Sequence, residues 1–270
     1  MKKYFIMMAF LTVPVIGLAE NYQHLLDYQF VHNLDDESPF QASVSQYTYF
    51  QRAVSTGKQA YGLENFYQRQ SYFTFFGLQG NANAGFRQSS YGVEFAKMAE
   101  RSPLFWNAGF SKSVSEYGQQ DEKVTRYGMG LGYYTGRHTR LMVDYQYADS
   151  TFVGRGEQSR SYGLSTIHVF PLGAKHAVSW WANLQRHEGR DEQTLSLGAD
   201  YHGRSWQTGM GVVTTAKTWT VDALRHSPAT ILHVSTDITD GVRVGLSYTY
   251  QENTFAANRR YLSAGIGLRI

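Results

Sequence analysis

The chain has 270 residues, no cysteine and a formal net charge of +3, and it is rich in Tyr (20), Phe (16) and Gly (26). Its mean hydropathy is nevertheless only −0.41. A chain with many aromatic residues and little net charge is not an intrinsically disordered one. The lack of cysteine excludes disulfide frameworks, zinc ribbons and iron–sulfur sites. Beyond the N-terminus no apolar run approaches the ~18 residues of a membrane helix, which excludes a polytopic helical protein.

The N-terminus has the pattern of a bacterial secretory signal peptide. Lys2 and Lys3 form a short basic region, residues 4–18 are mostly apolar, and small residues precede a cleavage point after Ala19. We therefore expect a signal peptide over residues 1–19 and a single mature domain over 20–270. The mature chain has 23 basic and 22 acidic residues, a net charge of +1. So small a charge gives no reason to expect a nucleic-acid partner.

Along the mature chain, apolar and polar residues alternate with the period of two that is typical of β-strands. Residues 127, 129, 131 and 133, for example, are Tyr, Met, Leu and Tyr, and they alternate with Arg126 and with glycines. In chain order the sequence predicts fourteen strands, at residues 22–32, 41–54, 59–78, 90–97, 104–115, 124–134, 139–148, 159–170, 174–186, 194–202, 205–214, 229–239, 242–251 and 259–270. Segment 59–78 is long for one strand and 219–223 would add another, so twelve or sixteen strands stay open.

The predicted connections form two interleaved sets. The short ones cover residues 55–58, 98–103, 135–138, 171–173, 203–204 and 240–241. The longer ones cover residues 33–40, 79–89, 116–123, 149–158, 187–193, 215–228 and 252–258. Short turns that alternate with longer loops, together with an even strand number, are typical of bacterial outer-membrane barrels. Four prolines lie at these connections, as expected if backbone N–H groups elsewhere are needed for strand pairing.

Strands with one apolar face fit either a soluble sandwich or an all-β, closed antiparallel transmembrane barrel. The barrel is favoured because the predicted strands have about ten residues, against a globular mean of about 5–6. Aromatic pairs such as Phe105–Trp106 and Tyr133–Tyr134 also lie near strand ends, like the interfacial girdles of such barrels. An open sheet in lipid would leave unpaired edges, so the barrel must close. We therefore expect a protein of the Gram-negative outer membrane that contacts its lipids.

In a barrel the polar stripe faces the lumen. Its charged members are predicted to be Asp27, Glu94, Arg126, Arg140, Asp144, Asp200, Asp237, Arg243 and Arg269. Both signs occur, so these groups either create a transverse field that screens solutes or pair with one another and fill the interior. The inward glycines either leave open lumen or admit close packing. About 8 strands give a filled barrel and about 16–18 an aqueous channel, so fourteen predict a narrow pore.

A catalytic function has weaker support. His233, Ser235 and Asp237 share one strand face and are the residue types of a serine hydrolase. Residues two apart on a strand are however about 6.5–7 Å apart, too far for direct contact. The acidic stretch 187–192 is best interpreted as a solvated loop. We expect no metal, no cofactor and no enzymatic activity.

Three parts of the chain resemble a family of small bacterial outer-membrane porins: Tyr-Phe-Gln-Arg-Ala at 49–53, Tyr-Gly-Met-Gly-Leu-Gly-Tyr-Tyr at 127–134, and the last strand. The resemblance covers most of the mature chain in pattern and implies an outer-membrane channel, but no ligand residues carry over from it. Such barrels commonly end in an aromatic residue that the barrel-assembly machinery recognises, whereas this chain ends in Ile270. Because the preceding alternation is kept, we still expect insertion by that machinery.

The favoured function is a narrow channel for small hydrophilic solutes. Two alternatives stay open: a non-channel barrel whose extracellular loops serve adhesion, reception or structure, and, with less support, a lipid-modifying enzyme. The sequence does not determine the solute, the oligomeric state, or whether the lumen is open or plugged.

Overall fold

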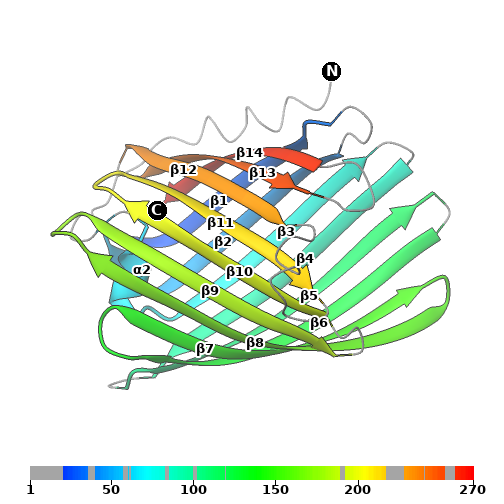
Figure 1. Ribbon diagram of the computed structural model, residues 1–270, viewed down its shortest axis with the longest axis horizontal. Helices are drawn as coiled ribbons and strands as arrows, with labels where there is room; N and C mark the ends of the chain where they lie inside the picture. The colour runs from blue at the N-terminus through cyan, green and yellow to red at the C-terminus, as the bar shows by residue number, and fades with distance from the viewer. Residues whose placement is uncertain are drawn as a thin grey trace.

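Fourteen antiparallel strands form a closed barrel in the computed structural model (Figure 1). Each strand pairs with its neighbours in the chain, and β1 pairs with β14 to close the seam. The predicted fold class and strand number are thereby confirmed. The structure describes residues 21–35, 40–56, 60, 62–82, 85–99, 102–118, 120–188, 192–216, 228–239, 241–252 and 259–270. The predicted signal peptide lies outside this part of the chain and stays a prediction.

The strands are β1 (Asn21–Asn33), β2 (Phe40–Ser55), β3 (Tyr72–Ala82), β4 (Phe86–Met98), β5 (Leu104–Tyr117), β6 (Gln120–Tyr134), β7 (Thr139–Phe152), β8 (Arg155–Pro171), β9 (Ala177–Glu188), β10 (Glu192–His202), β11 (Trp206–Ala216), β12 (Ala229–Thr239), β13 (Val242–Gln251) and β14 (Arg259–Arg269). The barrel therefore has two mouths. The proximal mouth is the end where β1 begins and β14 ends; the distal mouth is the opposite end. Among the described residues, no helix is long and apolar enough to cross a membrane.

The two faces of the barrel wall differ in chemistry. On β6, the alternate residues Tyr127, Met129 and Leu131 are 52%, 63% and 55% exposed, whereas Tyr134, which has the opposite parity, is only 3% exposed. Large apolar residues are exposed in the same alternate manner on the other strands. Exposing so many large apolar side chains to water is energetically unfavourable, whereas contact with a hydrocarbon layer is not. The outer face is therefore suited to lipid, and the opposite parity defines the inner face.

The connection between β2 and β3 differs from the prediction. The strand expected at 59–78 is wrong over the described residues 60 and 62–71, because β3 begins only at Tyr72, and most of the turn expected at 55–58 lies outside the described residues. The connection contains the short helix α2 (Glu64–Gln68), which ends at Arg69 in a left-handed conformation with φ 50°. Ala60, Leu63 and Tyr67 follow the helical spacing of three to four residues, so this segment has one apolar side. That side packs inside the barrel and not in the wall.

Several distal connections are shorter than expected. The predicted loops at 116–123 and 149–158 are shorter than expected, because β5 continues to Tyr117 and β6 begins at Gln120, and only residues 153–154 separate β7 from β8. Gly118 and Gly154 have φ of 65° and 76°, a conformation that glycine adopts without strain and that hairpin turns require. The strands β5 to β8 continue to these turns with mainly polar residues on both faces, apart from Tyr117 and Phe152 beside the turns. A strand segment that is solvated on both sides carries no alternation, which explains why the sequence pattern missed it.

Candidate functional site: the lumen and the segment that crosses it

The nine charged residues predicted for the polar stripe all have the inward parity of their strands. Asp144 illustrates this placement, because its carboxylate lies against the inner side of Gly163 on the neighbouring strand β8. The structure brings together three members at the proximal mouth, namely Asp237, Arg243 and Arg269. Asp27 lies beside them, across Gly267 from Arg243. The others are distributed over the inner wall.

The inward glycines receive large side chains from neighbouring strands. Gly132 faces the ring of Phe105, and Gly198 faces the indole of Trp181, so close in each case that a Cβ atom would collide with the ring. Asp27, Asp144 and Asp200 lie in the same way over Gly267, Gly163 and Gly209. Of the two interpretations of these glycines, close packing applies at these positions. Each of these side chains therefore lies against the backbone of a neighbouring strand.

Residues 60–71 cross the proximal mouth, and their apolar side meets one part of the wall. Ala60 and Leu63 form a buried cluster with Val169 of β8 and Ala177 of β9, and Phe66 and Tyr67 pack against its edge. Val169 is fully buried, with 0% of its surface exposed. We refer to residues 60–71 as the inward segment. The inward segment that covers this part of the inner wall explains why the wall is apolar here.

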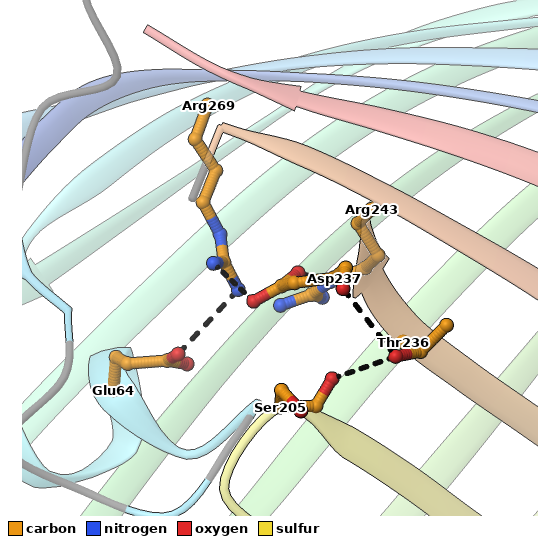
Figure 2. Close-up of polar contacts among 6 residues, drawn as sticks. All are labelled: Glu64, Ser205, Thr236, Asp237, Arg243 and Arg269. Atoms are coloured by element: carbon orange, nitrogen blue, oxygen red, sulfur yellow. Dashed lines mark hydrogen bonds and ion pairs between the residues drawn. The ribbon is translucent and has the colours of Figure 1, made fainter. Parts of the chain in front are cut away.

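An ion-pair cluster holds the other side of the inward segment (Figure 2). Glu64 of α2 and Arg269 of β14 are 5% and 7% exposed, and Arg269 Nη2 lies 3.4 Å from Glu64 Oε1. Arg269 Nη1 also donates to Asp237 Oδ2 at 2.8 Å, and Arg243 Nε lies 3.8 Å from Asp237 Oδ1. Two cations and two anions thus alternate across the mouth. Buried charges are stable only when they are paired in this way.

Polar contacts anchor the C-terminal part of the inward segment. The side chain of Gln68 bonds Ser55 twice: its Oε1 accepts from the Ser55 amide at 2.8 Å, and its Nε2 donates to the Ser55 carbonyl at 2.6 Å. Arg69 donates to the carbonyl of Gly136 and lies 4.3 Å from the ring centre of Tyr134 on β6. The segment therefore contacts β2, β6, β8, β9 and β14. Burial raises the pKa of the Tyr67 hydroxyl above its ordinary value of 10.0.

The remaining predicted residues make separate local contacts. Asp200 Oδ1 lies 2.9 Å from His233 Nε2, Glu94 accepts from the Tyr72 hydroxyl at 2.9 Å, and Arg126 donates to Ser113 Oγ at 3.2 Å. Arg140 lies 5.8 Å from the ring centre of Phe105. Each of these contacts joins side chains of the inner face, and whether the charges screen solutes stays a prediction.

The trio considered for catalysis is not assembled as a triad. His233 is directed toward Asp200 on β10 and Asp237 toward Arg269 on β14. Serine hydrolysis needs a base that contacts the serine and an acid that contacts the base. In this structure the acid of the trio, Asp237, is bonded to Arg269 instead.

Sequence reasoning missed Glu64, the inward partner of Arg269. The alternation of strands was extended through residues 59–71, where it assigned no lumen charge. The spacing of Ala60, Leu63 and Tyr67 was the signal that marks a helical turn there.

Comparisons with known proteins agree on the fold. No protein-family model matches the chain, and no curated protein matches it in sequence. The outer membrane protein Omp33 of Acinetobacter baumannii aligns with a TM-score of 0.66 and 14% identity, over 93% of this chain and 99% of that one. The CymD monoaromatic hydrocarbon channel aligns with a TM-score of 0.55 and 12% identity, over 92% and 89% of the two chains. CdiB from Acinetobacter baumannii gives 0.54 and 6%, over 92% and 60%. The chain thus has the fold of bacterial outer-membrane barrels, and at these identities the likeness carries nothing about solutes.

Proposed function

We propose that this protein is an outer-membrane channel that passes small hydrophilic solutes and that its inward segment limits the flow. The observation that carries the proposal is the contrast between the two faces of a closed barrel. The outer face exposes large apolar side chains, and the inner face combines charges with side chains laid flat on glycines. A wall of this kind suits a water-filled passage within lipid.

The proposal assigns an orientation to the barrel. Barrels of this type have both termini in the periplasm, so the proximal mouth is periplasmic and the inward segment restricts the exit. Ile270 continues β14 against β1, since its amide donates to the carbonyl of His24 at 2.8 Å. We expect the assembly machinery to accept this strand although its last residue is not aromatic. We also propose a transport role without catalysis.

Conductance in planar bilayers tests the proposal. Full-length protein, refolded in detergent and shown to be heat-modifiable on gels, should give discrete conductance steps in bilayers at high salt. A folded barrel that gives no steps, even when its inward segment is replaced by a short Gly/Ser linker, would reject the channel. The linker variant separates a barrel that never conducts from one that is held closed.

A further inference from the structure

Four aromatic rings follow one another around the inside of the distal mouth. Phe40 of β2, Phe86 of β4, Tyr117 of β5 and Phe152 of β7 have successive ring-centre distances of 6.3, 5.0 and 6.4 Å. All four lie at the distal end of their strand. We refer to them as the aromatic arc.

The aromatic arc belongs to the inner face. Phe40 packs on the inner side of Gly80, beside the buried Ala42. Phe152 has the parity of Asp144 on β7, whose carboxylate lies inside the barrel on Gly163. Tyr117 and Phe152 are nevertheless 47% and 43% exposed. These rings neither face lipid nor fill a core, so their apolar surface is open to whatever enters the mouth.

Polar groups stand beside the rings. Tyr117 and Phe152 line a cavity of about 710 Å³ together with Gln120, Glu122, Arg155 and Glu157. Ser150 donates to Glu122 Oε1 at 3.2 Å, which fixes one carboxylate at the cavity wall. The lining therefore offers hydrogen-bond donors and acceptors next to the flat aromatic faces. With two carboxylates and one guanidinium, it has a net charge of −1.

We propose that the aromatic arc is a binding site for neutral sugars at the entrance of the channel, a proposal that rests on the function proposed above. A pyranose ring has an apolar face of C–H bonds, which an aromatic face attracts through its negative quadrupole. Its edge carries hydroxyl groups that a carboxylate, an amide and a guanidinium can bind together. The excess negative charge disfavours sugar acids. A linear polyol has the hydroxyl groups but no flat face.

The arrangement of the aromatic arc suits the transient binding of a sugar in transit more than its tight retention. A channel needs sites that are favourable enough to admit a solute and weak enough to release it. Successive rings at similar spacing give a sugar several near-equivalent positions along the mouth, and the exposed rings can exchange one sugar for another without a conformational change. We therefore expect millimolar affinity.

Saturation-transfer NMR on the full-length protein in detergent tests the site, because it detects binding without conduction. The probes are maltose, glucuronate, sorbitol and benzyltrimethylammonium. We expect maltose to bind, with its ring C–H protons saturated most strongly, and glucuronate and sorbitol to bind at least about tenfold more weakly, a difference of about 1.4 kcal/mol. Tyr117→Ala and Phe152→Ala should each weaken maltose binding about tenfold, while Tyr117→Phe keeps it. Tyr127→Ala, on the lipid-facing side, is the matched control and should bind as the wild type does.

Several results would overturn the inference: no maltose binding, equal binding of sorbitol, tighter binding of the aromatic cation than of maltose, or unchanged binding in Tyr117→Ala. If Tyr117→Ala fails to fold, unchanged maltose binding in Phe152→Ala overturns the inference instead. Maltose binding without conductance steps would reject the channel and leave the sugar site. Conductance steps without maltose binding would reject the sugar site and leave the channel.

Discussion

Arg269 on the last strand and Glu64 in the inward segment form a buried ion pair across the proximal mouth, although 205 residues separate them in the sequence. Arg269 itself pairs with Leu25 of β1, so it lies in the seam that closes the barrel. The ion pair therefore joins the inward segment to this seam. The second carboxylate on Arg269, that of Asp237 at 2.8 Å, keeps the guanidinium paired whether or not Glu64 is present.

Replacing Glu64 by Gln should loosen the inward segment without unfolding the barrel. Removing one partner of a buried ion pair costs about 3–5 kcal/mol when the other charge is left alone. Arg269 keeps Asp237 here, so we expect the lower cost of about 1–3 kcal/mol that a lost charged hydrogen bond carries. The measurements are the open probability in bilayers and the rate of tryptic cleavage after Arg69, and both should rise. Glu188→Gln, at a surface pair 3.9 Å long with both side chains more than half exposed, is the control. Equal cleavage of Glu64→Gln and wild type would show that the pair does not hold the segment.

Gly132→Ala tests whether the glycines serve close packing. A Cβ atom at this position would collide with the ring of Phe105, so the ring must leave the wall. Overpacking of this kind costs about 1–3 kcal/mol. We expect a lower unfolding midpoint in urea, followed by tryptophan fluorescence, and a smaller conductance because the ring then projects into the lumen. Gly156→Ala, where nothing lies within 4 Å, should change neither quantity. Similar effects of the two substitutions would contradict this account.

Arg126→Gln should shift ion selectivity toward cations. Arg126 lies on the inner face, where its guanidinium is bound to Ser113 Oγ at 3.2 Å, and a charge on a low-dielectric wall acts on ions that pass. Reversal potentials in a salt gradient measure the effect. Arg186→Gln removes the same charge at the outward parity of β9 and should leave the potential unaltered. Should the two variants agree with wild type, Arg126 does not line the ion path.

The pair Asp35–Arg260 should make the seam sensitive to acid. Arg260 donates to both Asp35 oxygens, from its amide at 2.7 Å and from Nε at 2.9 Å, and these bonds hold the pKa of Asp35 below its ordinary value of 3.8. A lowered pKa in the folded state stabilises the fold above the unfolded value, and this contribution is lost as the pH falls through the folded value. Arg260 is exposed, so the effect is small. Asp35→Asn should lower the melting temperature slightly at pH 7, and the difference from wild type should vanish well below pH 3.8. A difference that persists in acid would assign the effect to something other than this carboxylate.

The strands that cross the lipid layer were predictable because their two faces meet different solvents. β13 was predicted at 242–251 and spans Val242–Gln251. Beyond the layer that contrast disappears. β8 was predicted to begin at residue 159 but begins at Arg155, since its distal residues are polar on both faces. Strand boundaries in water are set by pairing with the neighbouring strand, and a single-strand pattern does not reveal them.

The site was predictable in its parts but not in its assembly. The alternation of side chains along the strands places Asp237, Arg243 and Arg269 on the inner face. It does not show that Arg269 contacts Glu64, which lies in the connection between β2 and β3. That contact depends on the fold of residues 60–71, which pack against Val169 and Ala177 more than a hundred positions later in the chain. Long-range packing of this kind decides whether the lumen of a barrel is open. The alternation of residues along a strand gives no information about such packing.

Single-channel conductance shows whether the inward segment limits a channel whose lumen is otherwise open. The variant has the inward segment, residues 60–71, replaced by a short Gly/Ser linker, and it is compared with full-length wild type in the same bilayers and salt. Because the chain has no cysteine, neither protein can change through disulfide formation. We expect larger conductance steps and a higher open probability for the variant than for wild type. Identical conductance of the two folded proteins would contradict this expectation.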